Sequence, residues 1–210
     1  MRDEDFEYFI SKFGEASTPI EADKQVIEQY RGVLPDKLLE YWADDGWSGY
    51  AQGIFWVVNP TDYNDLLDMW LEDSPIAGID SYHVIARSAF GKLYVWGQNT
   101  NQKFTLNCPM HAIIASEKEL KTIKTNSESA IQAFFMSDKE RFDLEDMNDK
   151  PLFDQALKKL GPLAVDEVYG FEPILAAGGT LMVDNLAKLD LNIHLTILRQ
   201  MAEPKLISFG

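Results

Sequence analysis

Apolar side chains recur at helical spacing along the first 75 residues of the chain. They predict three amphipathic helices: one that ends at Gly14, one that opens at Leu34-Pro35 with Pro35 at its first position and stops at Gly46, and one over residues 62–73. An apolar run at 54–58 is typical of a buried strand. The helical spacing is clearest in the first helix, at Phe6, Phe9, Ile10 and Phe13.

Beyond Gly78 the pattern changes to short strands separated by turn residues. Helices return at 127–136 and after Pro151, and Ser137 with Glu140 has the spacing of a capping box. The last part predicts a short strand at 180–183 and a C-terminal helix. The buried side of that helix is predicted at Ile193, Ile197, Leu198 and Met201. The strands are predicted at 82–87, 92–96, 103–107 and 112–115.

This order of elements predicts an α+β fold, in which an antiparallel meander is flanked by helices. We divide the chain into an acidic region, 1–80, and a second region, 81–210, packed together as one compact unit. The hydrophobic fraction of 46% over 210 residues is ample for a packed core. The single cysteine, Cys108, cannot form an internal disulfide, and no secretion signal or membrane-spanning apolar run is visible. We therefore expect a cytoplasmic protein.

The negative charge is concentrated at the start of the chain. Residues 1–80 hold 18 Asp and Glu against 5 Lys and Arg, whereas residues 81–210 hold 16 against 14, which gives the net charge of −15. A focused acidic surface repels nucleic acid and anionic membranes, and it attracts basic proteins. Nucleases are basic because their substrate is a polyphosphate.

Two predicted helices carry the acids on one side, opposite the core residues Trp42 and Trp70. Such i, i+4 neighbours of like charge each cost about 0.2–0.5 kcal/mol, and the chain does not relieve them with lysine. This pattern favours a partner-binding surface, although acids can equally serve solubility. A calcium loop of the Asp-x-Asp-x-Asp-Gly type is absent. The acids are Asp36, Glu40 and Asp44 in the second helix, and Asp62, Asp65, Asp68, Glu72 and Asp73 in the third.

Trp47 and Tyr50 lie between glycines in the segment Gly46-Trp47-Ser48-Gly49-Tyr50. Large aromatic side chains in a loop are favoured anchors of protein interfaces, while packing over the edge of a sheet is about as common. The predicted partner-binding residues are Asp36, Glu40, Asp44, Trp47, Tyr50, Asp62, Asp65 and Glu72.

Catalytic patterns are absent from the sequence. His83, His111 and His194 have no further ligand at a recognised metal spacing, and Cys108 has no nucleophile signature around it. Gly178-Gly179-Thr180 lacks the lysine of a phosphate loop, which favours a simple turn. We therefore predict no metal, no cofactor and no enzymatic activity.

Two stretches of the chain resemble known families. The stretch from Leu34-Pro35-Asp36 through Asp45-Gly46-Trp47-Ser48-Gly49-Tyr50 to Gly53–Pro60 resembles the GAD-like domain of bacterial polymorphic-toxin loci. The residues Glu167-Val168-Tyr169-Gly170-Phe171, Pro173, Ala177-Gly178-Gly179, Asn185-Leu186 and His194-Leu195 resemble the C-terminal domain of type VI secretion immunity proteins, which neutralise a DNase. The Leu-Pro-helix-Gly element is also similar to the broader SUKH immunity superfamily.

The resemblance implies a cytoplasmic immunity protein that binds a cognate basic toxin, a DNase, and has no contact with nucleic acid or membrane. Two other classes stay open from the residues alone. One is a non-catalytic module that binds a small ligand or peptide, and the other is an enzyme with an unfamiliar site.

Overall fold

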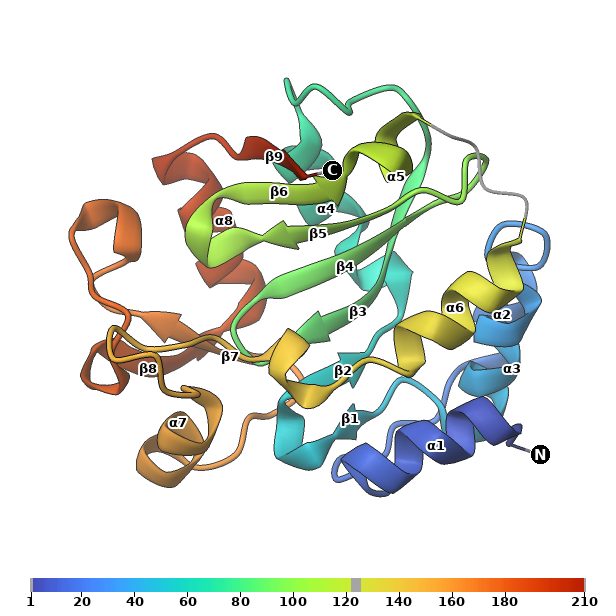
Figure 1. The fold of residues 1–210 in the computed structure, drawn as a ribbon, viewed down its shortest axis with the longest axis horizontal. Coiled ribbons are helices and arrows are strands. Elements are labelled where there is room, and N and C mark those ends of the chain that lie inside the picture. The colour runs from blue at the N-terminus through green and yellow to red at the C-terminus, as the bar shows by residue number, and fades with distance from the viewer. Residues whose placement is uncertain (1, 122–125, 210) are drawn as a thin grey trace.

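A seven-stranded sheet forms the centre of the computed structural model, which describes residues 2–121 and 126–209 (Figure 1). The strand order is β1-β2-β3-β4-β5-β6-β9, and neighbours are antiparallel except β6 and β9, which are parallel. The strands are β1 (Gly49–Tyr50), β2 (Phe55–Val57), β3 (Tyr82–Ser88), β4 (Lys92–Gly97), β5 (Lys103–Asn107), β6 (Ala112–Ser116) and β9 (Lys205–Phe209).

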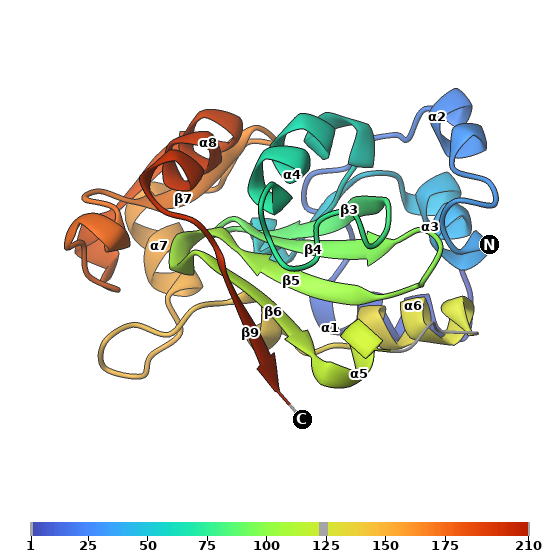
Figure 2. The ribbon, with the colours of Figure 1, turned by 90° about the horizontal axis from the view of Figure 1, so that it is seen from above.

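Helices cover both sides of this sheet. Helices α4 and α8 lie on one side and α6 lies on the other, while α1, α2 and α3 gather at the β1 end (Figures 1 and 2). A small second sheet joins β7 (Glu167–Phe171) to β8 (Leu186–Asp190). The helices are α1 (Glu4–Phe13), α2 (Lys24–Gln29), α3 (Asp36–Asp45), α4 (Asn64–Leu71), α5 (Glu117–Lys121), α6 (Ser127–Phe135), α7 (Phe153–Leu160) and α8 (Leu191–Met201). No helix in the described ranges has the length and apolar character needed to cross a membrane.

Local signals explain where the helices begin and end. The Asp3 carboxylate accepts the Phe6 N–H at 2.8 Å at the start of α1, and Gly14 ends that helix with a φ of 78°. Gly46 ends α3 with a φ of 73°, and a Cβ at this position would lie 1.9 Å from the Ile20 carbonyl oxygen. This helix end therefore requires glycine.

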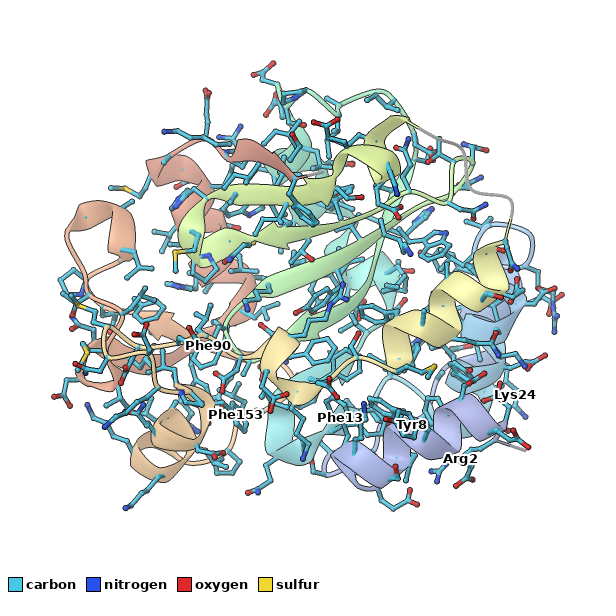
Figure 3. All side chains as sticks on the ribbon, viewed as in Figure 1. Arg2, Tyr8, Phe13, Lys24, Phe90 and Phe153 are labelled. Atoms are coloured by element: carbon cyan, nitrogen blue, oxygen red, sulfur yellow. The ribbon has the colours of Figure 1, made fainter. Side chains whose placement is uncertain are left out.

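Aromatic side chains form the core on the α6 side of the sheet. Phe55 of β2 is fully buried, and besides the Tyr50 ring of the neighbouring β1 it has rings from three further elements around it. Its ring centroid lies 5.6 Å from that of Phe9 and 4.5 Å from that of Phe142. Side chains fill the space between the sheet and the helices (Figure 3). The rings around Phe55 come from Phe9 and Phe13 in α1, Phe134 and Phe135 in α6, and Phe142 in the 3-10 helix η4 (Lys139–Phe142).

The predicted α+β fold and its antiparallel meander are confirmed. The four strands predicted beyond Gly78 match β3, β4, β5 and β6 to within a residue or so, and Pro35 is the residue before α3 rather than its first turn. Four strands had no sequence prediction: β1, the two strands of the small sheet, β7 and β8, and β9, which adds the C-terminal segment to the edge of the large sheet next to β6.

Two local predictions are wrong. Ser137 and Glu140 form no capping box, because the segment makes the single 3-10 turn of η4 after Asp138, with no side-chain cap. Residues 180–183 form no strand either. The Met182 N–H donates to the Thr180 carbonyl at 2.8 Å, and a 3-10 turn, η6 (Val183–Asn185), follows. The backbone is thus bonded locally, and the strand that pairs with β7 starts only at Leu186.

The predicted buried face of the C-terminal helix is also wrong in part. Of the four residues predicted, only Leu198 is buried, whereas Ile193, Ile197 and Met201 are 63%, 45% and 56% exposed. The helix packs through a face rotated by about one residue, because it must contact α4, β7 and β8 together. Its buried residues are Leu191, His194, Leu195 and Leu198.

Trp70 links the two regions of the chain and gives a test of this packing. It is fully buried in α4, and its indole N–H donates to the Leu195 carbonyl of α8 at 3.1 Å. We expect Trp70→Ala to lower the free energy of unfolding by about 3–5 kcal/mol, measured by urea unfolding. The control is Asp65→Asn on the exposed side of the same helix, which we expect to change it by less than about 0.5 kcal/mol. Equal losses in both variants would contradict the assigned helix face.

Candidate functional site

Helix α4 and the 3-10 turn before it, η2 (Pro60–Tyr63), carry the first acidic surface. Tyr63, Leu66, Leu67, Trp70 and Leu71 are buried against the sheet and α8, which leaves the acids on the outside. These acids form no ion pair with any described residue. We name this the α4 arc; its exposed members are Asp62, Asp65, Asp68, Glu72 and Asp73.

Helix α3 carries the second acidic surface, the α3 arc of Asp36, Glu40 and Asp44, all exposed. It is partly neutralised, since the Lys37 ammonium lies 2.7 Å from Glu40 and 3.1 Å from Asp3. Helix α3 lies at the β1 end of the sheet, whereas α4 lies beside α8 (Figure 2). The acids predicted from the sequence are therefore exposed as expected, but they belong to two separate surfaces.

The two aromatic side chains predicted as interface anchors, Trp47 and Tyr50, are more buried than such anchors need to be. Tyr50 is fully buried and its ring lies 4.9 Å from Phe9, so the prediction that Tyr50 contacts a partner is wrong. The alternative that the sequence left open, packing over the edge of the sheet, describes Tyr50 in β1. Trp47 is half-buried against Trp42, with ring centroids 5.9 Å apart, and it keeps an exposed part.

The three histidines and Cys108 lie in surroundings typical of structural residues. No three side chains of His, Cys, Asp or Glu in the described ranges are placed to hold a metal ion. Burial lowers the pKa of His83 and of His194, and burial raises the pKa of the Cys108 thiol, which disfavours the reactive thiolate. His111 bonds through Nε2 to the Leu198 carbonyl at 2.7 Å. None of these groups is paired for catalysis or ligation.

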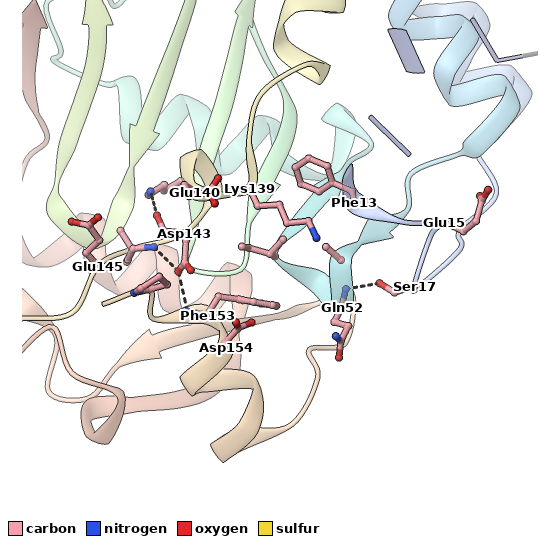
Figure 4. Close-up of a pocket in the computed structure, with 15 residues that line it drawn as sticks. Phe13, Glu15, Ser17, Gln52, Lys139, Glu140, Asp143, Glu145, Phe153 and Asp154 are labelled. Carbon is pink, nitrogen blue, oxygen red and sulfur yellow. Dashed lines mark hydrogen bonds between the residues drawn. The ribbon is translucent and has the colours of Figure 1, made fainter. Parts of the chain in front are cut away.

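A cavity of about 710 Å³ opens between the end of α1, the turn η1 (Ala51–Gly53), η4 and the start of α7 (Figure 4). Its walls combine apolar groups, including Phe13, Ile54 and Phe153, with seven charged side chains. Five are carboxylates and two are ammonium groups, so the lining is acidic. The charged residues are Glu15, Glu140, Asp143, Glu145, Asp154, Lys92 and Lys139.

Two of these charges are fixed by the backbone. Asp143 Oδ1 accepts the N–H groups of Leu144 at 2.7 Å and Phe153 at 2.9 Å. The Lys92 ammonium donates to the carbonyl oxygens of Asp143 and Arg141. Burial lowers the pKa of Lys92 to about 8, and burial raises the pKa of Asp143. Both groups thus hold the segment 141–153 in place beside the sheet.

No pattern in the sequence predicted this cavity. Its lining comes from residues near 15, 52, 92, 140 and 153, which no motif connects, and the fold alone brings them together.

Comparison with known families matches two parts of the chain. Residues 4–110 match the GAD-like domain. The chain belongs to the GAD-like family. Residues 128–202 match the C-terminal domain of the T6SS immunity protein Tdi1. Both expected resemblances are confirmed. The GAD-like match extends beyond residue 80 and takes in β3, β4 and β5, while the division at residue 80, based on charge, stays a prediction.

One solved structure shares the whole arrangement. The crystal structure of Atu4351 from Agrobacterium tumefaciens superposes on this GAD-like protein with a TM-score of 0.85 and 25% sequence identity. The match covers 97% of this chain and 92% of that chain. No curated protein matches the chain.

The buried lysine of the cavity gives a pH test. The unfolded chain holds the Lys92 proton up to about pH 10.5, whereas the folded chain releases it near pH 8. Between these values the unfolded state binds more protons, so this group makes the free energy of unfolding rise with pH. We expect the difference in unfolding free energy between wild type and Lys92→Met to increase in favour of wild type from pH 7.5 to pH 10, measured by urea unfolding.

The buried tyrosines are common to both proteins, so their titration cancels in this difference. A difference that stays constant or falls over this pH range would contradict the lowered pKa of Lys92.

Proposed function

We propose that this GAD-like protein is a cytoplasmic immunity protein that neutralises a cognate nuclease toxin of type VI secretion by binding it, with no catalysis of its own. The observation that carries the proposal is the match of residues 128–202 to the C-terminal domain of a T6SS immunity protein. The nuclease activity of the toxin is implied by the family resemblance, and the charge argument below supports a basic partner of this kind.

The charge supports a basic partner. The net charge is −15, and the α4 arc holds five exposed acids with no ion pair in the described chain. A nuclease carries positive charge where it meets the phosphates of its substrate. Acidic inhibitors associate faster with such a partner because the electric field steers the encounter.

The direct experiment is a pull-down with the full-length chain from a lysate of the source bacterium, followed by a nuclease assay on the recovered partner. We expect a basic nuclease that loses activity at one equivalent of this protein. Inhibition that is complete far below one equivalent would indicate catalysis, and a partner without nuclease activity would contradict the proposed toxin class.

The two acidic arcs are tested with matched variants that each remove three negative charges. One is Asp65→Asn/Asp68→Asn/Glu72→Gln on the α4 arc, and the other is Asp36→Asn/Glu40→Gln/Asp44→Asn on the α3 arc. We expect at least one of them to slow association with the toxin by on the order of tenfold at low salt and to flatten its salt dependence, in stopped-flow measurements. Wild-type association rates for both triple variants would exclude the acidic arcs from the interface.

Trp47 is tested separately because an anchor acts after the encounter. We expect Trp47→Ala to accelerate dissociation of the complex while the association rate changes little, in surface plasmon resonance. Since Trp47 also packs on Trp42, the free energy of unfolding of the variant is measured alongside. An unchanged dissociation rate would remove Trp47 from the interface.

A further inference from the structure

The cavity between η1, η4 and α7 has the chemistry of a receptor for a basic side chain. Glu140, Glu145 and Asp154 are exposed at its rim and form no ion pair with any described residue. Figure 4 shows them around the cavity, with Asp143 and Phe153 between them. The acids are spread around an opening rather than gathered for a metal ion, since no metal-binding group of three exists in the described ranges.

The apolar walls add a second preference. Phe13 and Phe153 line the cavity from α1 and α7, and only 3% and 4% of their surfaces are exposed (Figure 4). A cation already rests on one of these rings, because the Lys139 ammonium lies 5.7 Å from the centroid of Phe13. A guanidinium is planar and more weakly hydrated than an ammonium, so it suits a site that places carboxylates beside apolar groups.

One rim residue of the cavity is linked through Arg2 to the end of α3. Arg2 donates to Glu15 at the cavity rim, at 2.7 Å and 2.9 Å, and to Asp45 at the end of α3. The cavity volume lies within the range of about 300–1,000 Å³ typical of ligand sites, so it admits a side chain together with part of its loop.

We propose that this cavity receives an arginine side chain from a loop of the toxin, with Glu140, Glu145 and Asp154 as its charge partners and Phe13 and Phe153 as its aromatic walls. The inference rests on the proposed function, since the toxin supplies the arginine. Through Arg2 and Glu15, the contact would lie near Asp45 at the end of α3.

The cavity is lined by charges of both signs, so removing negative charges and removing a positive charge are expected to affect the Kd for the toxin differently. Glu145→Gln/Asp154→Asn removes two rim carboxylates, and we expect the Kd for the toxin to rise by about tenfold or more in isothermal titration calorimetry. Lys139→Ala removes the cation that competes for the Phe13 ring, and we expect an unchanged or lower Kd. An acidic occupant would reverse both effects, and that reversal would overturn the proposal.

The matched control is Glu172→Gln/Glu203→Gln, which makes the same charge change at exposed positions outside the cavity. A rise in Kd equal to that of Glu145→Gln/Asp154→Asn would show that only net charge matters and would overturn the cavity. All of these side chains are exposed, and the unfolding free energy of each variant confirms that it folds.

A probe independent of the toxin separates the two proposals. N-acetylarginine amide is titrated into the full-length protein, with N-acetylglutamine amide as the control, and amide shifts are followed by NMR. We expect saturable shifts at Gln52, Asp143 and Phe153 with the arginine compound only. If wild type neutralises a toxin but the cavity shows neither these shifts nor the variant effects, the cavity proposal fails and the immunity proposal stands. If no toxin binds, the immunity proposal fails, and the arginine titration alone decides what the cavity accepts.

Discussion

The burial of Phe55 is the interaction on which the rest of the structure depends. Its side chain lies on a three-residue strand near the edge of the sheet, where backbone bonding alone gives little stability. The surrounding rings come from α1, at the start of the chain, and from α6 and η4, more than 75 residues after Phe55. Large aromatic side chains supply much apolar area per residue, so this cluster helps to hold together three segments that lie far apart in the sequence.

The same aromatic cluster joins the two parts of the chain that match known families. Phe9 and Phe55 belong to the GAD-like match, whereas Phe134 and Phe142 belong to the match with the immunity-protein domain. The same join recurs on the other side of the sheet, where α4 packs on α8 through the bond from Trp70 to Leu195. The cavity lies along this seam, because the chain must pass from α6 through η4 to α7 over the end of α1. Its shape is therefore a consequence of how the two parts dock.

Sequence periodicity identified the elements whose stability is local. The helix at Phe6–Phe13 and the strands of the meander have strong patterns bounded by glycine or turn residues, and the structure confirms them. The wrong predictions concern residues whose burial depends on contacts with several other elements. Helix α8 has apolar residues nearly all round, so periodicity could not choose between Ile193 and Leu195, and only contacts with α4 and the small sheet decided it. The prediction for Tyr50 was wrong for a similar reason, because the two-residue strand β1 places its side chain in the core.

Predictions from charge are limited in the same way at the candidate site. A count of residues locates the surplus of acids before residue 80, but it does not say which of them already have partners. The structure separates the unpaired acids of the α4 arc from those of α3, where Lys37 and Arg2 intervene. It also adds Glu140, Glu145 and Asp154, which lie in the nearly neutral part of the sequence and were not predicted there to bind a partner. A partner responds to the local field of unpaired charges and to the shape that holds them, so a nearly neutral stretch can contribute the more specific contact, while the acidic stretch governs the rate of approach.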